Sequence, residues 1–337
     1  MRIDTADMPL SLAESDLPGK TPTHSGRSLR VAVVDEELPY PLNSGKRIRT
    51  YNLLTRLAAR HRITYLCHRN ADQDEARRAE THLRDCGIDT VVVDRIVPPK
   101  SGLGFYARLA GNLFSALPYS VATHASPALC QAILAHAVAN SVDLWHCEWT
   151  PYAQALRVLP DARRLIVAHN VESQIWQRYY ETEPHPLKRW YVRGQWRKFH
   201  RFERWAFTAS DRSVAVSSDD AARIRADFGA EQVDVVDNGV DTSYFQPTGD
   251  ARLAGQIVFL GSLDWRPNLD AVRLLLERIF PEVRNREPAA RLCLVGRHPP
   301  EWLYRETVLR PGVELHADLP DVRSFLRQSS VMAVPLR

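Results

Sequence analysis

The sequence predicts an α/β protein built from two doubly wound domains in tandem. From residue 29 onward, short β-branched runs alternate with longer segments whose apolar residues recur at helical spacing. Such alternation builds parallel sheets, because parallel strands need crossover connections that are usually helical. The chain has 337 residues, which is too long for one ordinary domain and fits two of about 150 residues each.

Ten short apolar runs are expected to be strands, and the segments between several of them are expected to be helices, such as 47–60 and 269–280. The expected strands are 29–34, 62–67, 90–93, 144–146, 165–168, 212–216, 233–236, 256–260, 291–295 and 331–335.

The turn residues at 245–250, Phe-Gln-Pro-Thr-Gly-Asp, interrupt this pattern before a new strand begins. We therefore expect a first domain at 29–246 and a second at 247–337. Residues 1–28 are polar, partly acidic and interrupted by proline, so we expect a disordered leader and no signal peptide.

Composition limits the class of protein. Apolar residues make up 45% and charged residues 25%, which is typical of a folded domain and excludes wholesale disorder. Five cysteines without a C-x-x-C pair predict neither a disulfide framework nor a zinc site, so we expect a reducing, cytoplasmic setting. No run reaches the roughly 18 apolar residues of a spanning helix, and a net charge of +4 argues only weakly for a polyanionic partner.

The first expected strand leads into a loop that ends with Asn43, Ser44 and Gly45, just before a helix. Lys46 and Arg49 fall in the first turn of that helix, where exposed amides and cations suit a phosphate. The loop matches neither the P-loop nor the G-x-G-x-x-G fingerprint, so on spacing alone an ordinary strand-to-helix turn fits it equally well.

His169 ends the expected strand 165–168 and is followed by Asn170. Its ring should therefore lie at the carboxyl edge of the first sheet, where doubly wound proteins bind ligands. A structural role for a lone histidine fits the residues equally well. His146 and Glu148 stand at another strand end, but tryptophans on both sides favour a packing role for them.

Three further loops follow expected strands, at 237–241, 259–268 and 294–300. Each contains glycine, and two contain an arginine, Arg266 or Arg297. Any one of them could be a simple turn. If all three converge on one sheet edge, they would form a pocket that suits a nucleotide diphosphate.

Taken in order, these features resemble family 4 glycosyltransferases of the GT-B fold, in particular the branch associated with bacterial exopolysaccharide assembly. The similarity covers residues 29–337, and its elements are specific only as an ordered set. They are the His169 strand, Ser217 after an apolar strand, Asn238-Gly239-Val240-Asp241 followed by Phe245 and Pro247, the Gly261 loop, Leu294-Val295-Gly296 and the final Val334-Pro335.

The resemblance implies two Rossmann-like domains facing across a cleft, with a nucleotide sugar held mainly by the second and a saccharide or lipid-linked acceptor against the first. It makes His169 the candidate catalytic residue, in contact with the transferred hexose. The implied donor-binding residues are Gly45, Asn238, Gly239, Gly261, Ser262, Arg266, Asn268, Gly296 and Arg297. The implied acceptor-side residues are Asn43, Ser44, Lys46, Arg49 and Asn170.

The family reaction retains anomeric configuration, and the leaving phosphate is usually proposed to take the proton of the acceptor. The paired carboxylates of glycosidases are then not required. The protein must instead stabilise the departing diphosphate with cations and helix-start amides. The resemblance implies no cofactor and no metal.

The sequence departs from the family pattern in two places. Family members often carry an arginine directly after the loop glycine and a lysine shortly after it, where this chain has Ser262 and Pro267; Arg266 is a candidate substitute. The chain also ends at 337, before the acidic loop and helix that grip the donor in the family. We therefore expect a truncated, incomplete second domain with uncovered apolar strand edges.

The segment 187–207 combines an arginine ladder with an apolar aromatic stripe. The stripe could lie on anionic lipid, but packing into the first domain is favoured because Trp and Phe also make good core contacts. The segment 101–117 is amphipathic too, so peripheral contact with the inner face of the cytoplasmic membrane is a second expectation.

Two rival functions come from other classes. A nucleic-acid-binding protein could use the basic aromatic segment 187–207, although it would need a basic groove and the mild net charge argues against it. A noncatalytic scaffold, degenerate or truncated, is the other alternative. Binding of UDP or GDP would separate a transferase from a scaffold.

Overall fold

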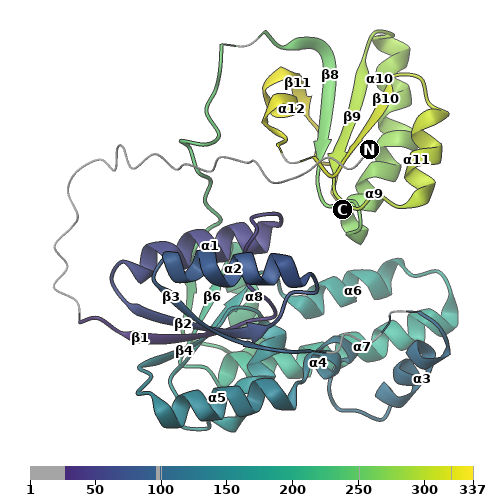
Figure 1. The fold of residues 1–337 in the computed structure, drawn as a ribbon. Coiled ribbons are helices and arrows are strands. Elements are labelled where there is room, and N and C mark those ends of the chain that lie inside the picture. Colours follow the sequence, from purple (N-terminus) through teal and green to yellow (C-terminus); the bar gives the residue numbers. More distant parts are fainter. Residues whose placement is uncertain (1–26, 96–98, 100, 250, 320, 337) are drawn as a thin grey trace.

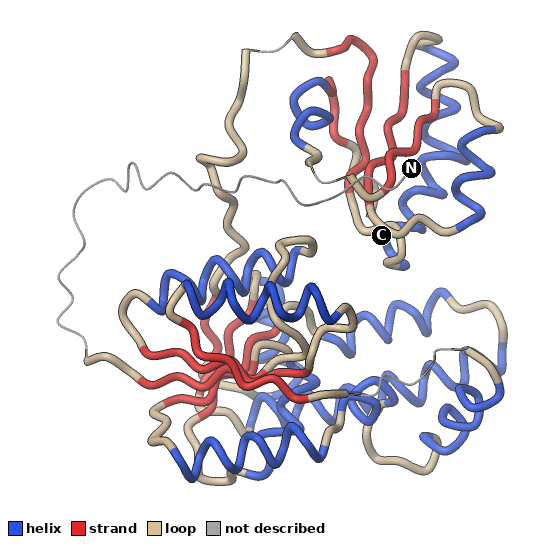
Figure 2. Tube along the Cα trace, viewed as in Figure 1, coloured by secondary structure: helices blue, strands red, loops and turns tan. Residues whose placement is uncertain are grey.

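The computed structural model describes residues 27–95, 99, 101–249, 251–319 and 321–336. It contains two lobes, each built on a parallel sheet with helices on both sides (Figures 1 and 2). The α/β class predicted by the alternating pattern is therefore confirmed. The expected leader lies almost wholly outside the described residues.

The first lobe holds a seven-stranded sheet in the order β3-β2-β1-β4-β5-β6-β7. Its strands are β1 Arg30–Val34, β2 Arg62–His68, β3 Ile88–Val93, β4 Leu144–Cys147, β5 Arg164–Ala168, β6 Arg212–Ala215 and β7 Val233–Val235. Its helices are α1 Gly45–Ala58, α2 Gln73–Asp85, α3 Leu103–Asn112, α4 Tyr119–His124, α5 Pro127–Ala139, the 3-10 helix η1 Thr150–Val158, α6 Glu172–Thr182, α7 Pro186–Thr208 and α8 Ser218–Phe228. The strand order reverses between β1 and β4, which places a ligand-binding crevice at the carboxyl ends of these strands.

The second lobe holds a four-stranded sheet in the order β10-β9-β8-β11. Its strands are β8 Leu253–Leu260, β9 Arg291–Gly296, β10 Val313–Ala317 and β11 Ser329–Met332. Its helical elements are α9 Arg266–Leu274, the π turn η2 Leu275–Ile279, α10 Phe280–Arg286, α11 Glu301–Val308 and α12 Arg323–Gln328.

Three sequence predictions for the second lobe were wrong in detail. The edge strand β10 was missed, because its residues, Val-Glu-Leu-His-Ala, alternate between apolar and polar and only its first residue is buried. The last strand lies at 329–332 instead of 331–335. The helix expected at 269–280 runs from Arg266 to Arg286, and it passes through the π turn just before Pro281, which has no amide hydrogen to donate.

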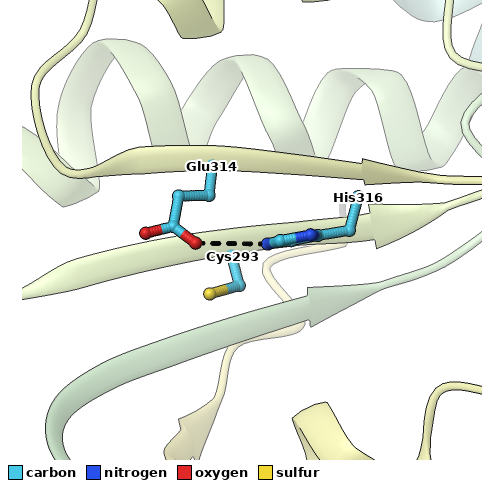
Figure 3. Close-up of side chains that lie close together, drawn as sticks. All are labelled: Cys293, Glu314 and His316. Carbon is cyan, nitrogen blue, oxygen red and sulfur yellow. Dashed lines mark hydrogen bonds and ion pairs between the residues drawn. The ribbon is translucent and has the colours of Figure 1, made fainter.

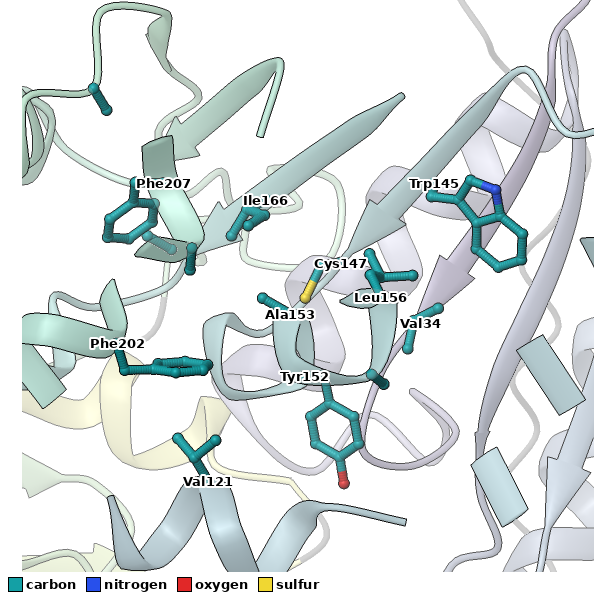
Figure 4. Close-up of a cluster of buried hydrophobic side chains, with 14 of the residues drawn as sticks. Val34, Val121, Trp145, Cys147, Tyr152, Ala153, Leu156, Ile166, Phe202 and Phe207 are labelled. Carbon is teal, nitrogen blue, oxygen red and sulfur yellow. The ribbon is translucent and has the colours of Figure 1, made fainter. Parts of the chain in front are cut away.

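The first sheet is buried on both faces, because its alternating side chains point to two separate cores. Val34 and Ile166 join the larger core with Tyr152, Phe202 and Phe207 (Figure 4). The opposite face packs a smaller core around Val33 and Tyr65, residues of β1 and β2, together with side chains of α1 and α2. The carboxyl ends of the central strands are thereby held between two packed layers.

Helix α7 is a core helix with a charged outer face. Val192, Phe199 and Phe202 are buried, whereas the ladder of arginines at 189, 193, 197 and 201 is exposed. The packing role favoured for this segment by the sequence is confirmed. Within the described part of the chain, no helix is both long and apolar enough to cross a bilayer.

Glu203 of α7 caps the start of α6 from outside that helix. Val171, the residue at the N-cap position, provides no side-chain hydrogen bond. Instead, the two carboxylate oxygens of fully buried Glu203 accept the backbone N–H groups of Glu172 at 2.6 Å and Ser173 at 2.9 Å. Two amides that would otherwise lack partners at a helix start are therefore satisfied by one remote side chain.

Replacing Glu203 with alanine should lower the free energy of unfolding by about 2–3 kcal/mol, since it leaves two buried amides unpaired. Urea titrations followed by circular dichroism measure this change. Glu181→Ala is the matched control, because Glu181 is exposed on α6 and bonds only Gln177 in the described structure; it should shift stability by less than about 0.5 kcal/mol. Equal losses in the two variants would contradict the capping role.

Candidate functional site

Charged side chains gather at the carboxyl ends of β1, β4 and β5, on both sides of the point where the strand order reverses. Asp35 directly follows β1, Glu148 follows β4 and His169 follows β5. Because β1 pairs with β4 and β4 with β5, these three positions lie at one edge of the sheet. The sequence prediction that His169 lies at this edge agrees with the structure.

Glu148 contacts three polar side chains at this edge. Its Oε1 accepts hydrogen bonds from Thr50 Oγ1 at 2.7 Å and from His169 Nε2 at 3.1 Å. Its Oε2 lies 2.7 Å from His146 Nε2. Only 3% of Glu148 is exposed. One buried carboxylate thereby joins α1, β4 and the end of β5.

The charge of Glu148 determines which ring nitrogen of His169 carries the proton. Burial raises the pKa of the Glu148 carboxyl, but hydrogen bonds and charges from His146 and His169 outweigh burial, and the pKa falls well below its ordinary value. An ionised carboxylate can only accept, so Nε2 of His169 carries the proton of the hydrogen bond with Glu148. In neutral His169 the other ring nitrogen, Nδ1, is then left as an acceptor.

The sequence underestimated Glu148. The flanking tryptophans favoured a packing role, and Trp145 is indeed 3% exposed in the larger core. Glu148 itself points to His169, which lies 21 residues further along the chain. The available signal was two strand ends, one carrying His146 and Glu148 and the other His169, in neighbouring positions of a predicted parallel sheet.

A second set of charges surrounds Lys46, at the start of α1. Lys46 Nζ lies 2.5 Å from Asp35 Oδ1 and 5.1 Å from the centroid of the Trp149 ring. Burial lowers the pKa of Lys46, but Asp35 and Glu36 outweigh it and the net shift is upward. Lys46 therefore stays a cation, with a quarter of its side chain exposed at the crevice.

Glu36 carries a negative charge beside Lys46. His124 Nε2 lies 3.1 Å from Glu36 Oε1, and Arg95 approaches the same oxygen to 4.0 Å. Burial raises the pKa of Glu36, but the hydrogen bond with His124 and the charge of Lys46 lower it to about 2. The crevice therefore presents fixed charges of both signs.

The other residues predicted on this side shape the loop before α1. Ser44 caps the helix by accepting the backbone N–H of Arg47, and Asn43 Oδ1 accepts from the guanidinium of Arg47 at 3.2 Å. A Cβ built on Gly45 would meet no atom within 4 Å, so this side of the loop is open. Asn170 is exposed directly after His169.

Arg49 holds the chain segment that follows β7. Its guanidinium donates to the carbonyls of Val236 at 2.7 Å and Asp237 at 2.9 Å, and to Asn238 Oδ1 at 3.1 Å. Arg49 is only 9% exposed. The structure thus brings the predicted residues Arg49 and Asn238 together, with Gly239 next in the chain.

The expectation of three loops on one sheet edge is wrong for the loop 237–241. This loop follows β7 of the first sheet, whereas the other two follow β8 and β9 of the second sheet. The predicted boundary at 246 already placed this loop in the first domain, and the shared strand-end glycine was not enough to group it with the other two loops.

Five predicted residues do meet at the carboxyl ends of β8 and β9. A Cβ on Gly296 would collide with the carbonyl oxygen of Gly261, so only glycine allows these two loops to approach so closely. Asn268 Nδ2 donates to the carbonyl of Ser262 at 2.9 Å. The carbonyl of Arg297 accepts the backbone N–H of Leu263 at 2.8 Å.

Arg266 contacts the first lobe. Its guanidinium carbon lies 3.6 Å from the centroid of the Tyr179 ring on α6, the helix that begins just after His169. The carboxyl edge of the second sheet therefore faces the His169 side of the first lobe (Figure 1). Tyr244 lies on the segment that connects the two lobes. The guanidinium carbon of Arg323, on α12 of the second lobe, lies 4.0 Å from the centroid of the Tyr244 ring.

Replacing Glu148 with glutamine should release the fixed proton of His169, because an amide oxygen attracts Nε2–H less strongly than a carboxylate does. Long-range ¹H–¹⁵N spectra of histidine-labelled protein, with His169→Gln used for assignment, should show one Nε2–H form in the wild type and a mixture in Glu148→Gln. The exposed Glu181→Gln should leave the spectrum unchanged. An unaltered His169 signal in Glu148→Gln would refute the orienting role.

Comparison with known proteins agrees with this architecture. Residues 44–244 match the family model described as Glycosyltransferase Family 4, and residues 254–337 match the model described as Glycosyl transferases group 1. No curated protein sequence matches the chain.

Solved structures with the same fold share little sequence. A crystal structure of TarM has a TM-score of 0.60 at 10% identity, covering 90% of this chain and 79% of that one. A mutant TarM from S. aureus, in complex with fondaparinux, alpha-GlcNAc-glycerol and UDP, gives 0.58 at 9%, covering 90% and 80%. The catalytic domain of starch synthase IV from Arabidopsis thaliana, bound to ADP and acarbose, gives 0.52 at 11%, covering 92% and 78%. At these identities the likeness shows the GT-B fold alone.

Proposed function

The chain belongs to glycosyltransferase family 4, and we propose that it moves a hexose, with retention of configuration, from a nucleotide diphosphate sugar to a saccharide or lipid-linked saccharide in exopolysaccharide or cell-envelope glycan synthesis. The observation that carries this proposal is His169, held by buried Glu148 at the crevice of the first lobe. The TarM and starch synthase structures contain UDP and ADP, the leaving groups of such donors.

The donor is assigned to the loops of the second lobe. The close approach of Gly261 and Gly296 leaves backbone at the carboxyl edge of the sheet, where phosphates bind in doubly wound folds. Helix α9 begins there without a side-chain cap, so the amides of Arg266 and Asn268 are available to an anion, although Pro267 between them has none. Arg297 supplies a nearby cation, and Arg266 supplies one at the contact between the lobes.

The first lobe is assigned the sugar and the acceptor. Glu148 accepts a hydrogen bond from Nε2–H of His169, which leaves Nδ1 to accept a hydrogen bond from a sugar hydroxyl. Lys46, on α1 of the first lobe, adds a positive charge on the side that we assign to the sugar. Ser44, Asn43 and Asn170 border the same opening and would face the acceptor.

In this scheme the protein stabilises the departing diphosphate through fixed cations and amides, and the leaving phosphate takes the proton of the acceptor. A preorganised group of this kind contributes about 2.7–4 kcal/mol to the transition state in other enzymes. A general base on the protein is not needed, and we expect the donor site to use neither a metal nor an organic cofactor.

The nucleic-acid alternative is not favoured by the structure. The aromatic stripe of α7 includes Phe199 and Phe202, which are 1% and 4% exposed and cannot stack on bases. Its exposed arginines recur every four residues, at 189, 193, 197 and 201, and so form a single row on one face of the helix. Binding of UDP or GDP would distinguish a transferase from the scaffold alternative.

Calorimetry with UDP and with GDP tests the donor site. The full chain should bind one of them with an affinity between millimolar and micromolar, and His169→Ala should change that affinity by less than about threefold. Hydrolysis of UDP-glucose or GDP-mannose should fall about 100-fold in His169→Ala, because orientation of the sugar is lost. His136→Ala, on the outer helix α5, should keep the wild-type rate.

Two outcomes would count against the proposal. A wild-type rate in His169→Ala would show that His169 is not part of the catalytic site. No binding of either nucleotide to the wild type would favour a noncatalytic scaffold.

We also propose peripheral contact with an anionic membrane through one end of the first lobe. Helix α3 packs on α7 through Asn112 and Gln195, whose side chains lie 2.9 Å apart. Several large apolar side chains are exposed on and beside α3 and on the first turn of α7: Leu103, Tyr106, Phe114, Leu187 and Trp190. The exposed arginines of α7 begin directly beside them, which suits anionic lipid headgroups.

Sedimentation with phosphatidylglycerol vesicles at low salt tests this contact. Wild-type protein should sediment with the vesicles. The double variant Leu103→Ser with Trp190→Ser should lose most of the bound fraction, since it removes apolar area that would be buried in the lipid on binding. Val138→Ser, an exposed apolar site on α5, should bind like the wild type. A wild type that stays in the supernatant would exclude the proposed membrane contact.

A further inference from the structure

A separate group of reactive side chains lies on one face of the second sheet (Figure 3). Cys293 belongs to β9, and Glu314 and His316 belong to its neighbour β10. Cys293 is paired directly across the strands with Glu314, and Val295 with His316. Residues two apart on a strand point to the same face, so thiol, carboxylate and imidazole all project from one side of the sheet.

The three side chains converge on a small volume. One ligand atom from each lies within 4.8 Å of the others. His316 Nε2 and Glu314 Oε2 are already 3.2 Å apart. The His316 ring rests on Phe325 of α12, with 4.5 Å between the ring centroids, so its orientation is restricted by packing.

We propose that Cys293, Glu314 and His316 form a zinc site. A thiolate, an imidazole and a carboxylate are the ligands that Zn²⁺ prefers, and three protein ligands leave the fourth tetrahedral position to water. Zinc bonds of roughly 2.0–2.3 Å put ligand atoms roughly 3.3–3.8 Å apart. The three ligand atoms, all within 4.8 Å of one another, are therefore already close to that spacing. On binding, the thiol releases its proton to solvent and the sulfur donates an electron pair to the metal.

One cation faces the same group. Arg291 Nη1 lies 3.9 Å from Glu314 Oε1, and two thirds of the Arg291 side chain is exposed. It approaches the oxygen that is turned away from His316, so Oε2 stays available to the metal. Because it is exposed, Arg291 can move toward solvent when the positively charged zinc ion binds.

No motif in the sequence indicates this site. Zinc motifs are recognised by ligands close together in the chain, whereas Cys293 and His316 are brought together by the pairing of β9 with β10, a strand that the sequence pattern missed. The bound ion would tie the outermost strand of the sheet to its neighbour. Its ligands are not among the residues assigned to the donor, so the expectation of metal-free catalysis is unchanged.

Cobalt and zinc titrations of the full, chelator-treated chain test the proposal. Co²⁺ should produce a near-ultraviolet sulfur-to-cobalt charge-transfer band that Zn²⁺ abolishes, and Zn²⁺ should raise the melting temperature. Cys293→Ser and His316→Gln should weaken Zn²⁺ binding more than about 100-fold, since even outer partners of zinc ligands contribute 10–100-fold. Cys86→Ser and His136→Gln should bind like the wild type.

Circular dichroism without metal shows whether each variant is folded, and His316→Gln, on the edge strand, keeps the test valid if Cys293→Ser is unfolded. The proposal is overturned if the wild type gives no charge-transfer band. It is equally overturned if the band survives in folded Cys293→Ser or disappears in Cys86→Ser.

Discussion

The buried negative charge of Glu148 is the constraint on which the first lobe depends. An ionised carboxylate with almost no access to water is costly unless it is fully hydrogen-bonded. Thr50 and His169 provide hydrogen bonds, and His146 Nε2 lies 2.7 Å from the second carboxylate oxygen. The requirement to satisfy one charge therefore aligns the start of α1 with the ends of β4 and β5, and it fixes the ring that we assign to the sugar.

The fold could be predicted because its strands are apolar and its helices amphipathic. All ten expected strands overlap observed strands to within a few residues, since buried parallel strands read as continuous apolar runs. β10 could not be found in this way, because an edge strand with alternating Glu and His has the composition of a loop. The loop 237–241 was grouped with two loops of the second sheet, although the predicted boundary placed it in the first domain, because a shared strand-end glycine is not enough to show a common sheet edge.

The site was predictable only in part. Strand ends indicated His169, and glycine-containing loops indicated Gly261 and Gly296, but their close approach was found only in the structure. The partners of His169 could not be read from the sequence, because Thr50, Glu148 and His169 are separated by 98 and 21 residues and meet only through the strand order. Arg49 likewise reads as a cation for a ligand, but its guanidinium is occupied by backbone carbonyls 187 and 188 residues further along the chain.

Arg49 and Arg323 have a mechanical consequence for the enzyme. Arg49 secures the chain to the first lobe as far as Asn238, and Arg323 secures it to the second lobe from Tyr244 onward. Between these two contacts the chain crosses from one lobe to the other at residues 239–243, where Asp241 Oδ1 accepts the backbone N–H groups of Ser243 and Tyr244. Any separation of the two lobes would also have to break the stack of Arg266 on Tyr179.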